Sequence, residues 1–100
     1  MQAVELRSRF EAGERDFCGA DLPGADLAQA DLRGADLRGA FLVKANLRAA
    51  NLHGADLRWG NLTDASLSQA VLAGADLFGA NPGEGRLAGR QPQWSGAELG

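Results

Sequence analysis

A large apolar residue recurs every five positions through thirteen consecutive units between Arg15 and Gly79. A period of five matches neither the 3.6-residue repeat of an α-helix nor the two-residue repeat of a β-strand. The chain must therefore turn a corner in every unit, and the pattern predicts a coil. The residues of this series are predicted to form the core: Phe17, Leu22, Leu27, Leu32, Leu37, Leu42, Leu47, Leu52, Leu57, Leu62, Leu67, Leu72 and Leu77.

The positions within each unit follow a fixed order. Alanine stands two positions before the large apolar residue in eleven of the thirteen units, with Arg15 and Gly60 as the exceptions. Residues two apart on an extended segment face the same side, so alanine and leucine face inward. The residue between them, usually Asp or Asn, faces water. The next two positions are rich in glycine and polar residues, which is typical of a tight turn with a positive φ.

One such side cannot bury its leucine alone, so successive coils must stack, as in other solenoid repeats. At the β-ladder spacing of about 4.8 Å, each inward leucine contacts a leucine above and below it. The interior then has room for only a methyl group at the companion position. The alanine and leucine columns are therefore interpreted as packing residues without a catalytic role.

The repeated Ala-(Asp/Asn)-Leu-X-X unit resembles the pentapeptide repeat family. The stretch Gly13-Glu14-Arg15-Asp16-Phe17, after a short helical pattern, is similar to the entry of some cyanobacterial members. The resemblance implies an all-β solenoid from a bacterial, cyanobacterial-like source: a right-handed quadrilateral β-helix with a short N-terminal α-helical cap. We expect a capping helix at 1–14, the β-helix at 15–81 and a partly flexible C-terminal tail at 82–100.

The N-terminal segment carries the apolar stripe of a short helix. Ala3, Leu6 and Phe10 fall at i, i+3 and i+7, and Gly13 is well placed to end the helix. This helix is predicted to form a lid on the first coil.

The repeat stops at Asn81-Pro82-Gly83, because proline removes a ladder donor. The open end around Leu72, Leu77 and Phe78 leaves two alternatives. Either the tail folds back across it, or the ends of two chains meet. We favour the second alternative, an end-to-end homodimer through the C-terminal coil.

Four sides imply twenty residues per coil, and reading the sequence at that interval predicts outward columns. Arg38 and Arg58 stand beside one acidic column, so this face is predicted to be a solvated ion-pair ladder. The acidic column consists of Asp16, Asp36, Asp56 and Asp76.

The charge of the chain is mildly acidic, with a net charge of −3 at pH 7. Direct nucleic-acid binding needs a basic surface and is therefore not expected. No apolar stretch has membrane-spanning length and no signal peptide opens the chain, so no membrane association is expected and the predicted location is the cytoplasm. The single Cys18 fits a reducing compartment.

The sequence offers no set of residues for catalysis or metal binding. His53 and Cys18 are the sole residues of their types, so neither a zinc site nor an assignable nucleophile and base is present. One carboxylate per coil supplies too few oxygens for calcium. We expect no enzyme activity, no catalytic residue, no metal and no cofactor.

A few apolar residues occupy outward positions that are polar in other units. Phe41 and Val43 take the usual Asp and Arg positions of one unit, and Trp59, Val71 and Phe78 interrupt other columns. Phe41, Val43, Trp59 and Phe78 form the candidate contact surface for a protein partner whose identity the sequence does not give.

The function favoured by the sequence is a non-enzymatic interaction module or scaffold. The resemblance supplies an alternative, because some family members mimic DNA, bind bacterial type II topoisomerase and confer quinolone resistance. Charge disfavours it here. About 16 Å of duplex DNA carries roughly nine charges, whereas the repeats carry eight Asp against five Arg and one Lys, a net −2.

Overall fold

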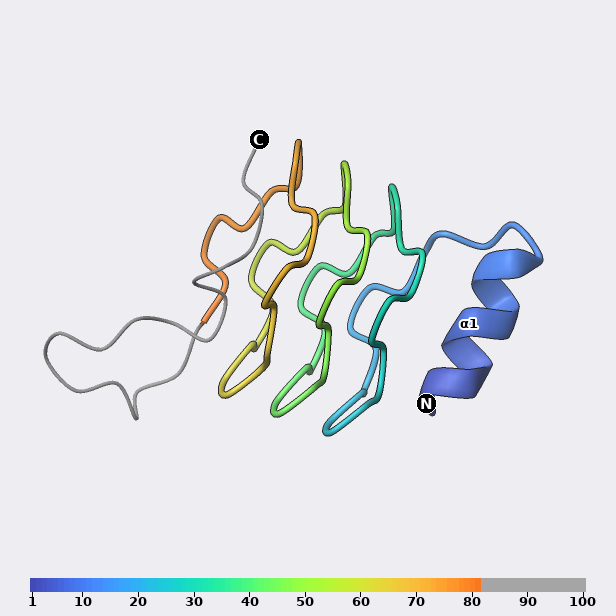
Figure 1. Ribbon diagram of the computed structural model, residues 1–100, viewed down its shortest axis with the longest axis horizontal. Coiled ribbons are helices and arrows are strands. Elements are labelled where there is room, and N and C mark those ends of the chain that lie inside the picture. The colour runs from blue at the N-terminus through green and yellow to red at the C-terminus, as the bar shows by residue number, and fades with distance from the viewer. Residues whose placement is uncertain (82–100) are drawn as a thin grey trace, which may run out of the picture.

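The computed structural model describes residues 1–81 of the chain. A short helix, α1 (Ala3–Glu11), is followed by a chain that winds into a tube of stacked coils. Figure 1 shows α1 lying across one end of this tube, with the coils following it in sequence order toward the other end.

Parallel β-bridges join each coil to the next. Every bridge links residues twenty positions apart, as in Asp16 to Asp36 and Asp21 to Phe41, and successive bridges are five residues apart. Each coil therefore has four bridged sides. Within residues 1–81 the bridges are isolated and no side extends into a longer strand. The extended conformation lasts for only about three residues before the next corner, so the predicted β-solenoid is built from single-residue bridges.

Three backbone hydrogen bonds per side hold neighbouring coils together. The N–H of Leu37 donates to the carbonyl of Asp56 at 2.7 Å, and the N–H of Gly39 donates to the carbonyl of Arg58 at 2.9 Å. In the opposite direction, the N–H of Asp56 donates to the carbonyl of Ala35 at 2.9 Å. The same pattern recurs around the tube, so neighbouring coils satisfy most of each other's polar groups.

Each corner is a tight turn with one residue in the left-handed region. The N–H of Ala20 donates to the carbonyl of Phe17 at 3.0 Å and closes the first of these turns, in which Gly19 has φ 70°. A positive φ at the third residue is the requirement of a type II turn. Glycine meets it in seven of the thirteen units, and six other residues adopt it: Gln29, Lys44, Ala49, Trp59, Asp64 and Gln69.

The interior of the tube contains the leucine column and its alanine companions. Phe17 and every leucine of the series from Leu22 to Leu72 are at most 3% exposed, whereas Leu77, in the last described unit, is only partly buried. Burying one leucine side chain contributes about 2 kcal/mol. The stability of the tube therefore comes from repeated leucine contacts between neighbouring coils.

Helix α1 closes the first coil with its apolar face. Leu6 and Phe10 lie four positions apart and are buried, while Val4 on another face is 69% exposed. The helix ends before Gly13, which has φ 101°. Its bounds lie inside the predicted capping segment 1–14. The division at 14 and 81 stays a prediction, and the predicted flexible tail at 82–100 lies outside the described residues.

Candidate interaction surfaces

Trp59 and Phe78 form an exposed aromatic pair on successive coils, which we call the aromatic corner. Their ring centroids are 5.2 Å apart and the ring planes meet at 86°, an edge-to-face contact. The N–H of Trp59 also donates to the carbonyl of Phe78 at 3.1 Å. The side chains nevertheless remain 64% and 67% exposed. The pair thus presents two large apolar groups to solvent in a fixed relative orientation.

The backbone of Trp59 is held in an unfavourable conformation. Its φ is 64°, which for a bulky residue costs roughly 1–2 kcal/mol. The indole ring lies over Gly79, where an added methyl group would overlap it. The sequence contains a signal for the unusual corner at Trp59. Reading every twentieth residue, Trp59 interrupts a column of three glycines: Gly19, Gly39 and Gly79.

The other two candidate residues, Phe41 and Val43, lie on the next side of the tube. Phe41 is bridged to Asp21 and Asn61 and is 48% exposed, and Val43 is half-buried. Among the described residues Phe41 makes no ring contact with the aromatic corner. The structure therefore divides the candidate partner surface into two patches.

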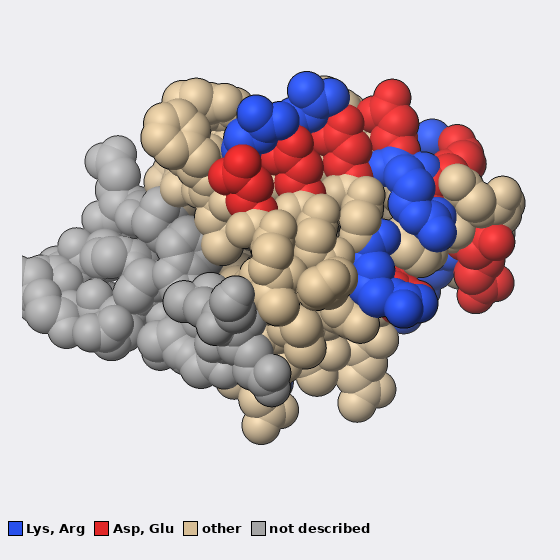
Figure 2. Space-filling view, turned by 90° about the horizontal axis from the view of Figure 1, so that it is seen from above, with Lys and Arg blue, Asp and Glu red and all other residues tan. Residues whose placement is uncertain are grey.

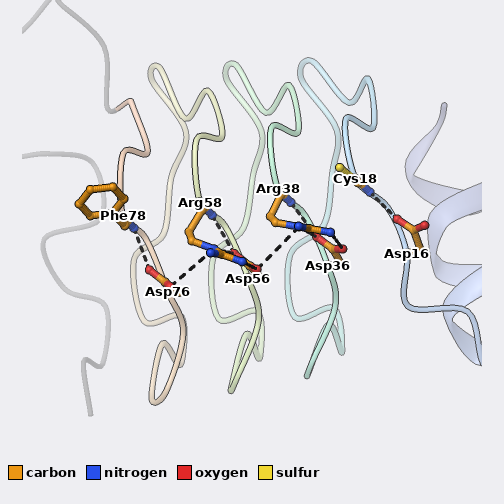
Figure 3. Close-up of polar contacts among 8 residues, drawn as sticks. All are labelled: Asp16, Cys18, Asp36, Arg38, Asp56, Arg58, Asp76 and Phe78. Carbon is orange, nitrogen blue, oxygen red and sulfur yellow. Dashed lines mark hydrogen bonds and ion pairs between the residues drawn. The ribbon is translucent and has the colours of Figure 1, made fainter.

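Three residues of the acidic column, Asp36, Asp56 and Asp76, form a continuous chain of ion pairs with Arg38 and Arg58. We call it the ion-pair ladder (Figure 3). Arg38 Nη2 lies 2.7 Å from Asp36 Oδ2, and Arg38 Nε lies 3.8 Å from the carboxylate of Asp56 on the next coil. Arg58 repeats this arrangement at 2.6 Å from Asp56 and 3.7 Å from Asp76. Each arginine therefore bridges two coils, as the sequence columns predicted. Figure 2 shows a row of acidic side chains on this face with basic side chains beside it.

The ion-pair ladder lowers the pKa of two of its carboxyl groups, those of Asp36 and Asp56. The hydrogen bond from Arg58 lowers the pKa of Asp56 to about 2, and that from Arg38 lowers the pKa of Asp36. On another side, Arg33 lowers the pKa of Asp31 to about 2 through its own hydrogen bond. These side chains are partly or fully open to water, so each pair contributes little to stability.

At its N-terminal end the acidic column continues to Asp16, which lies outside the ion-pair ladder. Cys18 stands where the next coils carry Arg38 and Arg58, and its N–H donates to Asp16 Oδ1 at 3.1 Å. Among residues 1–81, Asp16 makes no salt bridge. Arginine therefore offsets the negative charge in the middle of the acidic column, but not at its N-terminal end.

The Asp and Asn side chains of these columns also hold the corners in place. The Oδ1 atom accepts the backbone N–H two residues later, as in Asp36 with Arg38 at 3.2 Å and Asn51 with His53 at 3.1 Å. This is an Asx-turn. The sequence pattern predicts only that these residues face solvent. Their role in the turns was missed, although short polar side chains beside a turn are the signal for it.

A hollow of about 350 Å³ lies between α1 and the first coil. Its lining combines Arg7, Phe10, Glu11, Arg15 and Asp31. The Arg15 guanidinium lies 3.7 Å from the centre of the Phe10 ring and donates to the Phe10 carbonyl at 3.0 Å. The hollow contains charges of both signs, and its arginines are held by backbone carbonyls.

The residues considered for chemistry lie apart on the surface. Cys18 and His53 are both exposed on separate sides of the tube. Within the described residues, no three His, Cys, Asp or Glu side chains gather into a group able to hold a metal ion. No helix within residues 1–81 has the length and apolar character needed to cross a membrane.

The repeat pattern and the stacked coils agree with the comparison to known families. The pentapeptide repeat model matches residues 16–48 and 50–81, with eight copies. The chain therefore belongs to the pentapeptide repeat family. A comparison with curated proteins gave no match.

Solved structures with a similar chain are also pentapeptide repeat proteins. One from the thylakoid lumen of Arabidopsis thaliana is 25% identical, with a TM-score of 0.65 over 72% of this chain and 52% of that protein. The protein alr5209 from Nostoc PCC 7120 is 30% identical over 99% of this chain and 96% of its own, with a TM-score of 0.39. The present chain spans about half the length of the Arabidopsis protein. Family membership and the Arabidopsis structure imply a right-handed β-helix solenoid.

Proposed function

We propose that this protein is a non-enzymatic interaction module that binds a protein partner through the aromatic corner. The observation that carries this proposal is Trp59, which is large, exposed and held at a positive φ. Glycine occupies the same corner in the coils on either side, so the backbone does not need an indole there. A strained, exposed side chain that the fold does not require is typical of a functional position.

The chemistry of the aromatic corner fits a protein surface. Tryptophan and other aromatic residues contribute a large share of binding energy in protein interfaces. Here the edge-to-face contact and the packing over Gly79 fix both rings before binding, which lowers the entropy cost of association. The partner is expected to offer an apolar pocket or ridge to the two rings. Arg58 and Asp76 of the ion-pair ladder flank the site and supply a polar rim.

The test replaces the aromatic corner with residues from its own columns. Trp59→Gly and Phe78→Arg restore the glycine and arginine found one coil earlier in each column, so the fold should persist. The matched control is Phe41→Asn with Val43→Thr on the neighbouring side of the tube. These substitutions introduce the residues found one coil later in the same columns, Asn61 and Thr63. Quantitative pull-down from lysate should lose a partner with the first pair and keep it with the control. Retention by the Trp59 and Phe78 variant would reject the aromatic corner as the site.

We also propose an end-to-end homodimer through the C-terminal coil. The support is Leu77, which is partly exposed whereas the preceding leucines are buried. Sedimentation velocity from micromolar to millimolar protein should show a monomer converting to a dimer and no further. A monomer throughout that range would reject the dimer.

The alternative of a DNA-mimicking topoisomerase modulator gains no support from the charge arrangement. Arg38 and Arg58 lie within the acidic column and offset its carboxylates. The evenly spaced negative charge of a duplex is therefore not reproduced on this face. A cytoplasmic location and a bacterial source remain predictions.

A further inference from the structure

The first coil has a hydrogen-bonding edge with no coil before it. In the middle of the tube, carbonyls at the Asp position accept N–H groups from the preceding coil, as Asp56 does from Leu37. The corresponding carbonyls of the first coil belong to its four bridged residues, Asp16, Asp21, Asp26 and Asp31. Unpaired edges of this kind are templates for association with another chain.

The N-terminal segment occupies this edge. The ammonium group of Met1 donates to the carbonyl of Asp21 at 3.1 Å. Arg7 Nη2 donates to the carbonyls of Asp26 and Ala28 at 3.2 and 3.1 Å. Leu6 and Phe10 cover the apolar end of the interior beside these contacts. The segment therefore takes over part of the hydrogen bonding of a preceding coil, at the carbonyls of Asp21, Asp26 and Ala28, together with its apolar contact.

The last described coil has the complementary set of groups. The N–H of Leu62 donates to the carbonyl of Asn81 at 2.7 Å. The N–H groups of Leu67, Leu72 and Leu77, on the following sides, have no acceptor among residues 1–81. Since every coil repeats one bonding pattern, these donors are the ones that a further coil would satisfy.

The first coil of a second copy fits this position in register. After Asn81 the next side of the spiral would lie above Ser66, because bridged residues are twenty positions apart. Placing Asp16 of the second copy above Ser66 requires a half-turn about the tube axis, which the four alike sides permit. The N–H groups of Leu67, Leu72 and Leu77 then face the carbonyls of Asp16, Asp21 and Asp26 of the second copy. Two of these three carbonyls are the ones that Met1 and Arg7 occupy.

We propose that the edge of the first coil beneath α1 is a self-association surface, that its partner is the C-terminal edge of a second copy, and that α1 competes with that copy. The contact is head-to-tail, so it does not close on itself and leads to an open-ended filament. When α1 is docked on the first coil, it blocks this head-to-tail association. A protein that draws α1 away from the tube would switch the chain from discrete particles to filaments.

The test undocks α1 in the full-length chain. Leu6→Asp with Phe10→Asp places two carboxylates against the apolar end of the tube, so α1 should leave it. We expect unbranched filaments by electron microscopy and sedimentation that increases with concentration beyond a dimer. The matched control is Val4→Asp, which changes the exposed face of the same helix and should sediment as the wild type does.

A mixing experiment separates head-to-tail growth from unspecific aggregation. A wild-type monomer offers its C-terminal edge but keeps its first coil sealed, so it should add to the filament end that exposes a first coil and stop growth at that end. Filaments of the undocked variant should therefore become shorter as wild type is added. Filaments of unchanged length would overturn the proposal, as would an undocked variant that keeps its β-helical circular dichroism and stays monomeric or dimeric.

A second variant covers the case in which the double substitution prevents folding. Arg7→Met removes the two hydrogen bonds to Asp26 and Ala28 and leaves the apolar contacts of Leu6 and Phe10 in place. It should form filaments that wild type shortens, at higher protein concentration than the undocked variant, whereas Val4→Asp should not. A soluble Arg7→Met protein with the sedimentation of wild type would overturn the proposal in that case.

Discussion

At the scale of single residues, the corners show how strongly the backbone limits the choice of side chain. Each of the thirteen turns from Gly19 to Gly79 has its third residue at positive φ. Glycine occupies this position in only seven turns. The sequence predicted this conformation from its glycine-rich positions. It did not identify which of the other six corner residues serve a purpose, because exposure and ring contacts distinguish Trp59 only in three dimensions.

Neighbouring alanines at one corner give a direct test of this strain. Ala49 has φ 58°, whereas Ala50 is fully buried in the companion column. Ala49→Gly should raise the free energy of unfolding by about 1 kcal/mol, because it relieves the left-handed conformation. Ala50→Gly should lower it by about 1 kcal/mol, since it removes a buried methyl group and adds chain entropy. Urea denaturation measures both changes, and a destabilised Ala49→Gly protein would contradict this account.

The ion-pair ladder predicts a pH dependence with a defined sign. The pKa of Asp56 is lowered from 3.8 to about 2 in the folded protein, so its carboxylate favours folding above about pH 4, and that contribution is lost as the pH falls toward 2. Arg58→Gln should move the pKa of Asp56 back toward 3.8 in an NMR titration. It should also lower the melting temperature between pH 4 and 7 and make it less sensitive to pH below 4.

Arg48→Gln is the control for this substitution, because Arg48 takes the same position in its unit but stands beside Asn46. Its replacement should leave the pKa of Asp56 and the acid limb of the melting curve unchanged. An equal effect of both substitutions would mean that general charge, and not the contact with Asp56, sets the pH response.

At the scale of elements, the five-residue side is the repeating structural unit. Its extended part is shorter than an ordinary strand. The period of the leucines was sufficient to predict the coil, its corners and its inward columns. The helix was predictable from Ala3, Leu6 and Phe10, which share one face. The hydrogen bonds from Arg7 to the first coil were not, because they depend on where α1 crosses the end of the tube.

Leucines at different depths should differ in their contribution to stability. Leu47 is fully buried between coils, whereas Leu77 is partly exposed. Leu47→Ala should lower the free energy of unfolding by about 2–5 kcal/mol, the usual cost for a buried leucine. Leu77→Ala should cost less than half as much, because it removes fewer contacts. Chemical denaturation of both variants checks the order, and equal losses would show that Leu77 is covered in solution.

At the scale of the whole molecule, the fold was far more predictable than the site. Thirteen units in one register fix which residues stack, so the ion-pair ladder could be read from columns at an interval of twenty. The aromatic corner was only partly predictable. Trp59 and Phe78 were identified as apolar outliers, but their contact and the space above Gly79 depend on side-chain rotamers. The five-residue period fixes the inward residues and leaves the outward ones free to vary, so it does not identify a binding partner.

Amide exchange should report the difference between the middle and the end of the tube. The N–H of Leu57 donates to Asp76 and that of Leu62 donates to Asn81, so both should exchange slowly. The N–H groups of Leu67, Leu72 and Leu77 have no acceptor among residues 1–81 and should exchange faster. Hydrogen exchange followed by NMR at low protein concentration measures this. Slow exchange at all five positions would show that another segment or a second copy pairs with the edge.

The bridging interval has a consequence for how such a chain changes in evolution or design. Adding five residues at a corner would leave the leucine interior continuous, but every later side chain would rotate by one face of the prism. An insertion between Arg38 and Asp56 would keep Arg58 beside Asp56 on their shared side. It would separate Arg38 from Asp56 on the adjoining coil, so the charged stripe would break at the insertion. Twenty residues would restore the stripe and simply lengthen the rod. Surface patterns on this scaffold are therefore preserved by whole-turn duplications and scrambled by smaller ones.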